Sequence, residues 1–149
     1  MSHLSPAEQV GLRLLRVHDT VYRKTGGRIG HHIPFGPPCL LLHTVGAKTG
    51  KARTNALSYA RDGADYLVVA SNGGDSRAPG WFHNLKADPR AEINAGPKRF
   101  AVTARAVFPG DPDFDRLWRI VNDMKGNANR YIGYQKRTSR PIPVVVLTP

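Results

Sequence analysis

A series of short strand-like segments, separated by glycine, proline and aspartate turns, limits what this chain can fold into more than any other feature. Residues 40–45 are apolar enough for a buried strand and stop at a glycine. Residues 54–60 and 66–70 form two more segments around an Arg61-Asp62-Gly63 turn signal. The pattern therefore predicts a meander of three strands.

The second half of the chain continues this pattern. Residues 91–94 and 100–107 flank a Gly96-Pro97 turn, and residues 142–147 give a last strand. Six strands joined largely by hairpins predict a mainly antiparallel α+β domain or a small barrel. In the longest strand, alternation places four side chains on one face: Phe100, Val102, Ala104 and Ala106.

Three helical segments accompany the strands. A capping box at Ser5-Pro6-Ala7-Glu8 begins an amphipathic basic helix over about residues 6–24. Pro79 opens a short helical stretch that runs through residue 85, and apolar spacing predicts another helix over residues 112–125. An apolar stripe like that of the first helix usually packs on the domain's own core, and contact with a membrane surface is the alternative.

Length and composition fit one domain. The 149 residues, 40% of them hydrophobic, can form a core, and no repeat or linker divides residues 1–149. The apolar runs are far shorter than the roughly 20 residues of a membrane-spanning helix, and charges interrupt any signal-peptide core near the start. The single cysteine, Cys39, cannot form an internal disulfide, so we expect a cytoplasmic protein.

The net charge of +11 is concentrated at both ends of the chain. Residues 1–61 hold nine Lys and Arg against two acids, and residues 125–149 hold five against none. Residues 62–124 are close to neutral. If the two ends meet, their surface would attract an anionic ligand, nucleic acid or an anionic membrane; the alternative is a basic protein whose charge only keeps it in solution.

The sequence gives little support for a metal site or for a residue that acts as a covalent nucleophile. Cys39 and His43 are four residues apart in a predicted strand, which separates them by about 13 Å, too far for one zinc ion. The adjacent His31 and His32 have no acid or cysteine nearby, so we expect no metal site. No G-x-S-x-G turn occurs, and Cys39 lies in an apolar run that disfavours a thiolate.

Two glycine-rich loops remain as candidate binding elements. Residues 46–53 can present backbone N–H groups and three cations to a phosphate or carboxylate, but three residues between Gly46 and Gly50 are too few for a Walker A loop. Residues 71–74, Ser-Asn-Gly-Gly, would let the backbone approach a planar or anionic ligand. Each loop could equally be a simple tight turn.

Taken together, these segments resemble the deazaflavin-dependent nitroreductase (F420H2-dependent reductase) family of actinobacteria. The likeness covers about residues 38–107 and resumes at residues 131–135 and 140–144. The motifs that carry it are residues 44–55, Asp62-Gly63, residues 69–74 and residues 79–89. The resemblance implies a split β-barrel of the flavin-binding type that uses reduced coenzyme F420 as hydride donor. It implies an electron-poor hydride acceptor, such as a quinone, an activated enone or a nitroaromatic.

The resemblance also implies the site. Loop 47–49 and the strand start 53–58 would hold the phosphate and oligoglutamate tail of the coenzyme, and segments 69–72 and 79–84 would line its ring. Ser71 would tune the ring, Tyr131 would close the pocket, and Tyr131 or Tyr134 would donate a proton. Trp81, Tyr131 and Tyr134 could instead be core or barrel-capping aromatics. The cofactor-binding residues implied are Ala47, Lys48, Thr49, Arg53, Thr54, Asn55, Ala56, Leu57, Ser58, Val69, Ala70, Ser71, Asn72, Gly73, Gly74, Pro79, Gly80, Trp81, Phe82, His83, Asn84 and Tyr131.

Three positions depart from the family pattern, which often has a basic residue at Ala47, lysine at Asn72 and tyrosine at Ser58. Two other functions stay open: an FMN-dependent enzyme of the same fold, and a basic module without catalytic activity for nucleic acid or acidic lipid. The loops lack the interleaved aromatics of single-strand binders, so we expect no nucleic-acid partner. Peripheral contact with the inner face of the cell membrane and a homodimer are further hypotheses.

Overall fold

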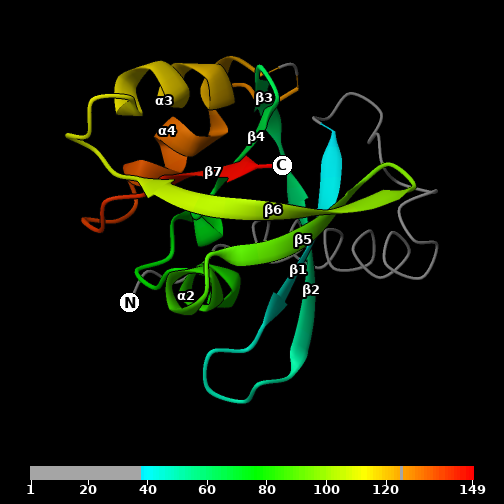
Figure 1. Ribbon diagram of the computed structural model, residues 1–149. Helices are drawn as coiled ribbons and strands as arrows, with labels where there is room; N and C mark the ends of the chain where they lie inside the picture. Colours follow the sequence, from blue (N-terminus) through cyan, green and yellow to red (C-terminus); the bar gives the residue numbers. More distant parts are fainter. Residues whose placement is uncertain (1–37, 125) are drawn as a thin grey trace.

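One antiparallel sheet organises the computed structural model, which describes residues 38–124 and 126–149. The helix predicted over residues 6–24 lies outside the described residues. The strand order is β2-β1-β5-β6-β7-β4-β3, and Figure 1 shows the sheet curling around the centre of the molecule. The strands are β1 (Cys39–Val45), β2 (Ala52–Ser58), β3 (Ala60–Asp62), β4 (Asp65–Val69), β5 (Arg90–Ala95), β6 (Lys98–Val107) and β7 (Val144–Thr148).

The predicted three-strand meander is wrong in its middle strand, which is divided at Tyr59. β2 pairs with β1 and β3 pairs with β4, at opposite ends of the strand order. The N–H of Tyr59 donates to the carbonyl oxygen of Pro38 at 3.0 Å, outside the β2 ladder. One continuous segment therefore links the two edges of the sheet, which a curled sheet requires and an alternating pattern alone does not reveal.

The concave face of the sheet forms the first core. Leu40, Leu42 and Ile93 are fully buried there, and helix α2 (Gly80–Ala87) covers one end with Trp81 and two neighbours. The predicted apolar face of β6 is confirmed, since its four side chains all belong to or pack against this core. This packing places α2 beside the β1–β2 loop, where the candidate site lies.

The opposite face carries a second core under helices α3 (Phe114–Asp123) and α4 (Arg130–Gln135). Figure 1 shows α3 and α4 together on one side of the sheet and α2 on the other. The helix predicted over residues 112–125 is shorter by two residues at each end. Strand β7 supplies both cores, because its side chains alternate between them. The mainly antiparallel α+β fold expected from the sequence is confirmed.

Candidate functional site

A cavity of about 750 Å³ lies between the β1–β2 loop, the start of β2 and the first half of α2. Its floor is partly aromatic, since Trp81 is 5% exposed and belongs to the first core. Its rim is polar and basic, with Lys48 and Arg53 both exposed. The lining residues are Gly46, Ala47, Lys48, Thr49, Ala52, Arg53, Thr54, Asn55, Gly80, Trp81, His83 and Asn84.

The loop on one side of this pocket is closed by its own hydrogen bonds. The N–H of Gly46 donates to the carbonyl of Lys51 at 2.8 Å, and the N–H of Gly50 donates to that of Gly46 at 2.9 Å. A side chain at Gly46 would meet the Thr49 hydroxyl at 2.6 Å, and Gly50 has a φ of +68°. The glycines are therefore required by the turn itself, whether or not a ligand binds.

Asn84 joins this loop to α2. Its side-chain oxygen accepts the N–H of Ala47 at 2.9 Å, and its amide nitrogen donates to the Thr44 hydroxyl at 3.0 Å. Thr44 is 7% exposed and lies on β1 directly opposite Arg53. The loop, the strand and the helix are thus connected through one amide group.

The electrostatics of the pocket favour an anion. Its lining contains Lys48, Arg53 and the His83 imidazole, and the described residues that line it include no Asp or Glu. Within the described residues, neither Lys48 nor Arg53 forms an ion pair. Hydroxyl and amide groups of Thr49 and Asn55 add neutral hydrogen-bonding capacity. This donor set fits a phosphate or a polycarboxylate tail.

The pocket brings together ten of the sequence-predicted site residues: Ala47, Lys48, Thr49, Arg53, Thr54, Asn55, Gly80, Trp81, His83 and Asn84. The others lie elsewhere. Pro79 precedes α2 as its N-cap, and Phe82 points into the first core. The remaining ones are Ala56, Leu57 and Ser58 farther along β2, Val69 to Gly74 at the end of β4, and Tyr131 and Tyr134 on α4.

The segment after β4 is a tight left-handed turn, the 3₁₀ element η1 (Asn72–Gly74). All three of its residues have positive φ, and a side chain at Gly74 would lie 2.8 Å from the Tyr134 carbonyl oxygen. The preceding Ser71 is 7% exposed. η1 packs directly against α4, so the predicted ring-binding segment and the two tyrosines are neighbours in the fold.

The side chain of Arg140 binds the backbone on both sides of the η1 turn. Its guanidinium donates to the backbone carbonyls of Ala70 and Ser71, each at 3.1 Å, and to that of Asp75 at 3.2 Å. Burial lowers the pKa of Arg140 from its ordinary value, and Asp75 opposes that shift. Arg140 has no predicted role from the sequence. No local signal could have indicated one, because its acceptors lie 65 to 70 residues earlier.

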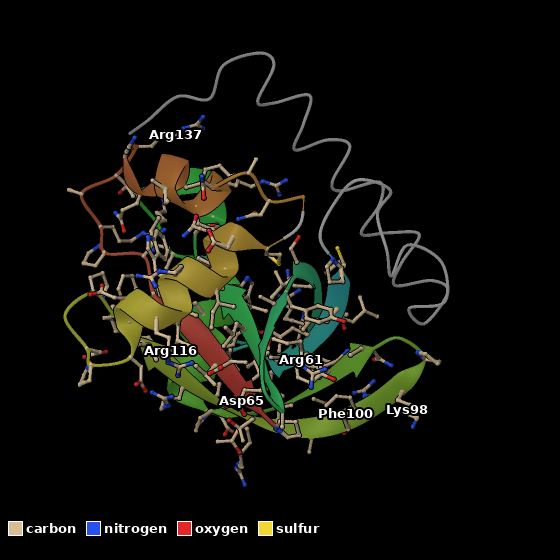
Figure 2. All side chains as sticks on the ribbon, turned by 90° about the horizontal axis from the view of Figure 1, so that it is seen from above. Arg61, Asp65, Lys98, Phe100, Arg116 and Arg137 are labelled. Carbon is tan, nitrogen blue, oxygen red and sulfur yellow. The ribbon has the colours of Figure 1, made fainter. Side chains whose placement is uncertain are left out.

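The two candidate tyrosines share a face of α4, as a helical turn predicts. Their ring centroids are 6.2 Å apart, and Tyr131 also approaches Trp118 at 6.5 Å. Tyr131 is 6% exposed and belongs to the second core, so the structure places it among capping aromatics and outside the lining of the pocket. Burial raises the pKa of Tyr131 to about 12. The guanidinium of Arg137 lies 5.7 Å from the Tyr134 ring, and Figure 2 shows Arg137 at the α4 end of the molecule.

His43 is a further polar residue behind the pocket wall. Its Nε2–H donates to the Asn94 side-chain oxygen, and Nδ1 then accepts from the Thr54 hydroxyl at 3.0 Å. Burial lowers the pKa of His43, while the Asn94 hydrogen bond acts in the opposite direction. From the sequence, His43 was a candidate only for metal ligation. Its role in joining β1, β2 and β5 depends on strand register.

Two comparisons place the chain among known sequences. A family model described as F420H(2)-dependent quinone reductase matches residues 14–149. An F420H(2)-dependent quinone reductase of Mycobacterium tuberculosis is 68% identical over 139 residues, 93% of this chain and 92% of the relative. A second M. tuberculosis protein, described as a putative F420H(2)-dependent quinone reductase, is 35% identical over 122 residues, 82% of this chain and 98% of the relative.

Solved structures agree with the sequence relatives. A structure described as an F420-H2 dependent reductase (FDR-A) has a TM-score of 0.63 at 32% identity, covering 78% of this chain and 97% of its own. Another, described as a domain-swapped dimer, has a TM-score of 0.65 at 30% identity and covers 96% of this chain and 99% of its own. The split-barrel fold expected from the resemblance is therefore confirmed. Among the described residues, no helix is long and apolar enough to cross a membrane.

Proposed function

This chain belongs to the F420H(2)-dependent quinone reductase family, and from that premise we propose that it binds reduced F420 in the pocket beside α2 and reduces a quinone. The observation that carries the proposal is the basic lining of a cavity of about 750 Å³, in which the described residues include no carboxylate. A coenzyme with a phosphate and a polyglutamate tail needs such a surface, because charge-assisted hydrogen bonds are roughly twice as strong as neutral ones.

The protein's own contribution is placement and electrostatics. Lys48 and Arg53 hold the anionic tail, while Trp81 forms an apolar wall on the α2 side. When bound, reduced F420 supplies the hydride, and the chain supplies orientation relative to the acceptor. The resemblance implies Tyr131 or Tyr134 as the proton donor, and both lie on α4, outside the lining of the pocket. Tyr131 stays protonated because its pKa is near 12, which suits a hydrogen-bond donor.

The acceptor class follows from the relatives, whose descriptions name quinones. Activated enones and nitroaromatics are also electron-poor and remain candidate acceptors. A panel of a short-chain quinone, an enone and a nitroaromatic, each assayed with the same F420H2 concentration, ranks them by kcat/KM. We expect the quinone to rank first.

A homodimer and peripheral membrane contact belong to the same proposal. One solved relative is described as a domain-swapped dimer, which supports a dimer here, and light scattering on the purified protein measures it directly. The net charge of +11 supports contact with an anionic membrane from the cytoplasmic side. Full recovery in the supernatant after sedimentation with anionic vesicles would count against that contact.

The decisive experiment is coenzyme binding. F420 fluorescence should be quenched on titration with the protein, and NADPH or FMN should not replace F420H2 in turnover. Protein that purifies yellow with bound flavin would instead indicate an FMN-dependent enzyme. A strongly salt-dependent DNA shift without coenzyme binding would indicate a nucleic-acid module.

A further inference from the structure

We infer that Asn84 and Thr44 form a latch that fixes the β1–β2 loop against α2 and thereby sets how tightly the pocket binds its anionic ligand. The resemblance assigned Asn84 to direct cofactor contact. The structure assigns it a positioning role, acting through the backbone of Ala47. This inference rests on the proposed function for the identity of the ligand, but the latch itself is a property of the chain alone.

The orientation of the Asn84 amide follows from its partners. The backbone N–H of Ala47 can only donate, so the side-chain oxygen of Asn84 must face it, and the nitrogen then faces the Thr44 hydroxyl. The two bonds measure 2.9 and 3.0 Å. Both ends of the amide are thus held by protein groups, and the ligand is not needed to orient it.

Thr44 makes the latch rigid and separates it from the ligand. It is 7% exposed, and it is not among the residues that line the pocket. Its hydroxyl therefore acts on the pocket only through Asn84. A side chain with these properties can be changed without removing any group that a ligand would touch.

The loop depends on this latch for its position. The Gly46–Lys51 and Gly50–Gly46 bonds close the loop on itself but do not connect it to the helix. Among the hydrogen bonds between described residues, the one from Ala47 to Asn84 is the link between this loop and α2. Since Lys48 follows Ala47, fixing the Ala47 amide also fixes the start of the cationic rim opposite Trp81.

The test uses Thr44→Val, which keeps the side-chain shape and removes the hydroxyl. We expect the Kd for F420 to rise about fivefold to tenfold, the loss that one hydrogen bond produces. In the ligand-free protein, amide hydrogen exchange at Ala47 should accelerate, while exchange in β6 should not change. Thr44→Ser, which restores a hydroxyl, should return both values toward wild type. Thr103→Val makes the same change at an exposed position of β6 and serves as the control.

Two outcomes would overturn the inference. Unchanged Kd and Ala47 exchange in Thr44→Val, with binding lost in Asn84→Leu, would show that Asn84 contacts the ligand directly. Exchange that accelerates equally in the loop and in β6 would make Thr44 an ordinary core residue. If wild-type protein does not bind F420 at all, the proposed function fails, whereas Ala47 exchange still decides the existence of the latch.

Discussion

The guanidinium of Arg140 donates a 3.1 Å hydrogen bond to the backbone carbonyl of Ser71, which lies 69 residues earlier in the chain. The same group also reaches the carbonyls on either side of the η1 turn, at Ala70 and Asp75. One side chain of the C-terminal segment therefore fixes the turn that the family resemblance assigns to the coenzyme ring. Without Arg140 these carbonyls would lose a charged donor, and that of Ser71 would keep the N–H of Gly74 at 2.9 Å.

Replacing Arg140 should destabilise the fold. We expect Arg140→Leu to lower the free energy of unfolding by about 2–4 kcal/mol, because three partly buried carbonyl oxygens lose a charged donor. Urea denaturation measures the change. Arg119→Leu, at an exposed position of α3, should alter stability by less than about 0.5 kcal/mol. Equal effects of the two substitutions would contradict the proposed anchoring.

The cationic rim should control coenzyme affinity. Lys48→Ala and Arg53→Ala should each raise the Kd for F420 by about tenfold or more, since a charge-assisted bond contributes about 1.5–3 kcal/mol. Fold stability should change little because both side chains are exposed. Lys98→Ala, at the far end of the β5–β6 hairpin in Figure 2, removes the same charge outside the pocket and is the control. Equal F420 affinity of wild type and the Lys48/Arg53 double variant would refute this assignment.

Gly74 tests the packing of η1 on α4. Gly74→Ala combines a φ of +85° with a side-chain atom only 2.8 Å from the Tyr134 carbonyl oxygen, so we expect a loss of about 2–3 kcal/mol in unfolding free energy. Gly63→Ala also has a positive φ, +60°, but its new atom would meet nothing within 4 Å. The free energy of unfolding of Gly63→Ala should therefore fall by about 1 kcal/mol. Thermal denaturation of the Gly74→Ala and Gly63→Ala variants measures both losses. The difference between them gives the cost of the close contact at residue 74, because both variants share the strain of a positive φ.

The hydroxyls of the α4 tyrosines should have different kinetic roles. Tyr131→Phe should lower kcat more than it weakens coenzyme binding, because a neutral phenol can donate to charge that develops only during reaction. Tyr134→Phe should mainly change the relative kcat/KM of different acceptors. Steady-state kinetics with two acceptors and a separate F420 titration distinguish these effects. Unchanged kinetics in both variants would make the two tyrosines structural caps of the second core.

His43 should make stability pH-dependent. Burial lowers its pKa in the folded protein, so the unfolded chain binds a proton more readily below the usual His pKa of about 6.5. The contribution of His43 is therefore fully present above about pH 6.5 and is lost as the pH falls through that value toward the lowered folded pKa. His43→Gln should reduce the dependence of the unfolding free energy on pH in this range. Urea denaturation of wild type and variant between about pH 5 and 7.5 gives the comparison, and parallel curves would rule out the effect.

Much of the site was visible in the sequence because its signals are local. The glycines and cations of the β1–β2 loop, and the first turn of α2 after its N-cap Pro79, lie within short segments, and the pocket brings together ten of their residues. The divided strand at Tyr59 was not visible, since an alternating pattern continues through a bend. The short helix α4 was not predicted, because six residues carry too little periodicity to distinguish a helix from an extended segment.

The sequence by itself determined the family, the antiparallel strands and the basic loop, because turn residues, alternation and charge act over a few neighbouring positions. The tertiary structure alone decided that Asn84 is held by Thr44 and Ala47, that Arg140 supports the η1 turn, and that Tyr131 is buried. These relationships join residues that are brought together only when the sheet curls and the helices pack on it. Their energies depend on burial and on hydrogen-bond geometry, and neither exists until the chain has folded.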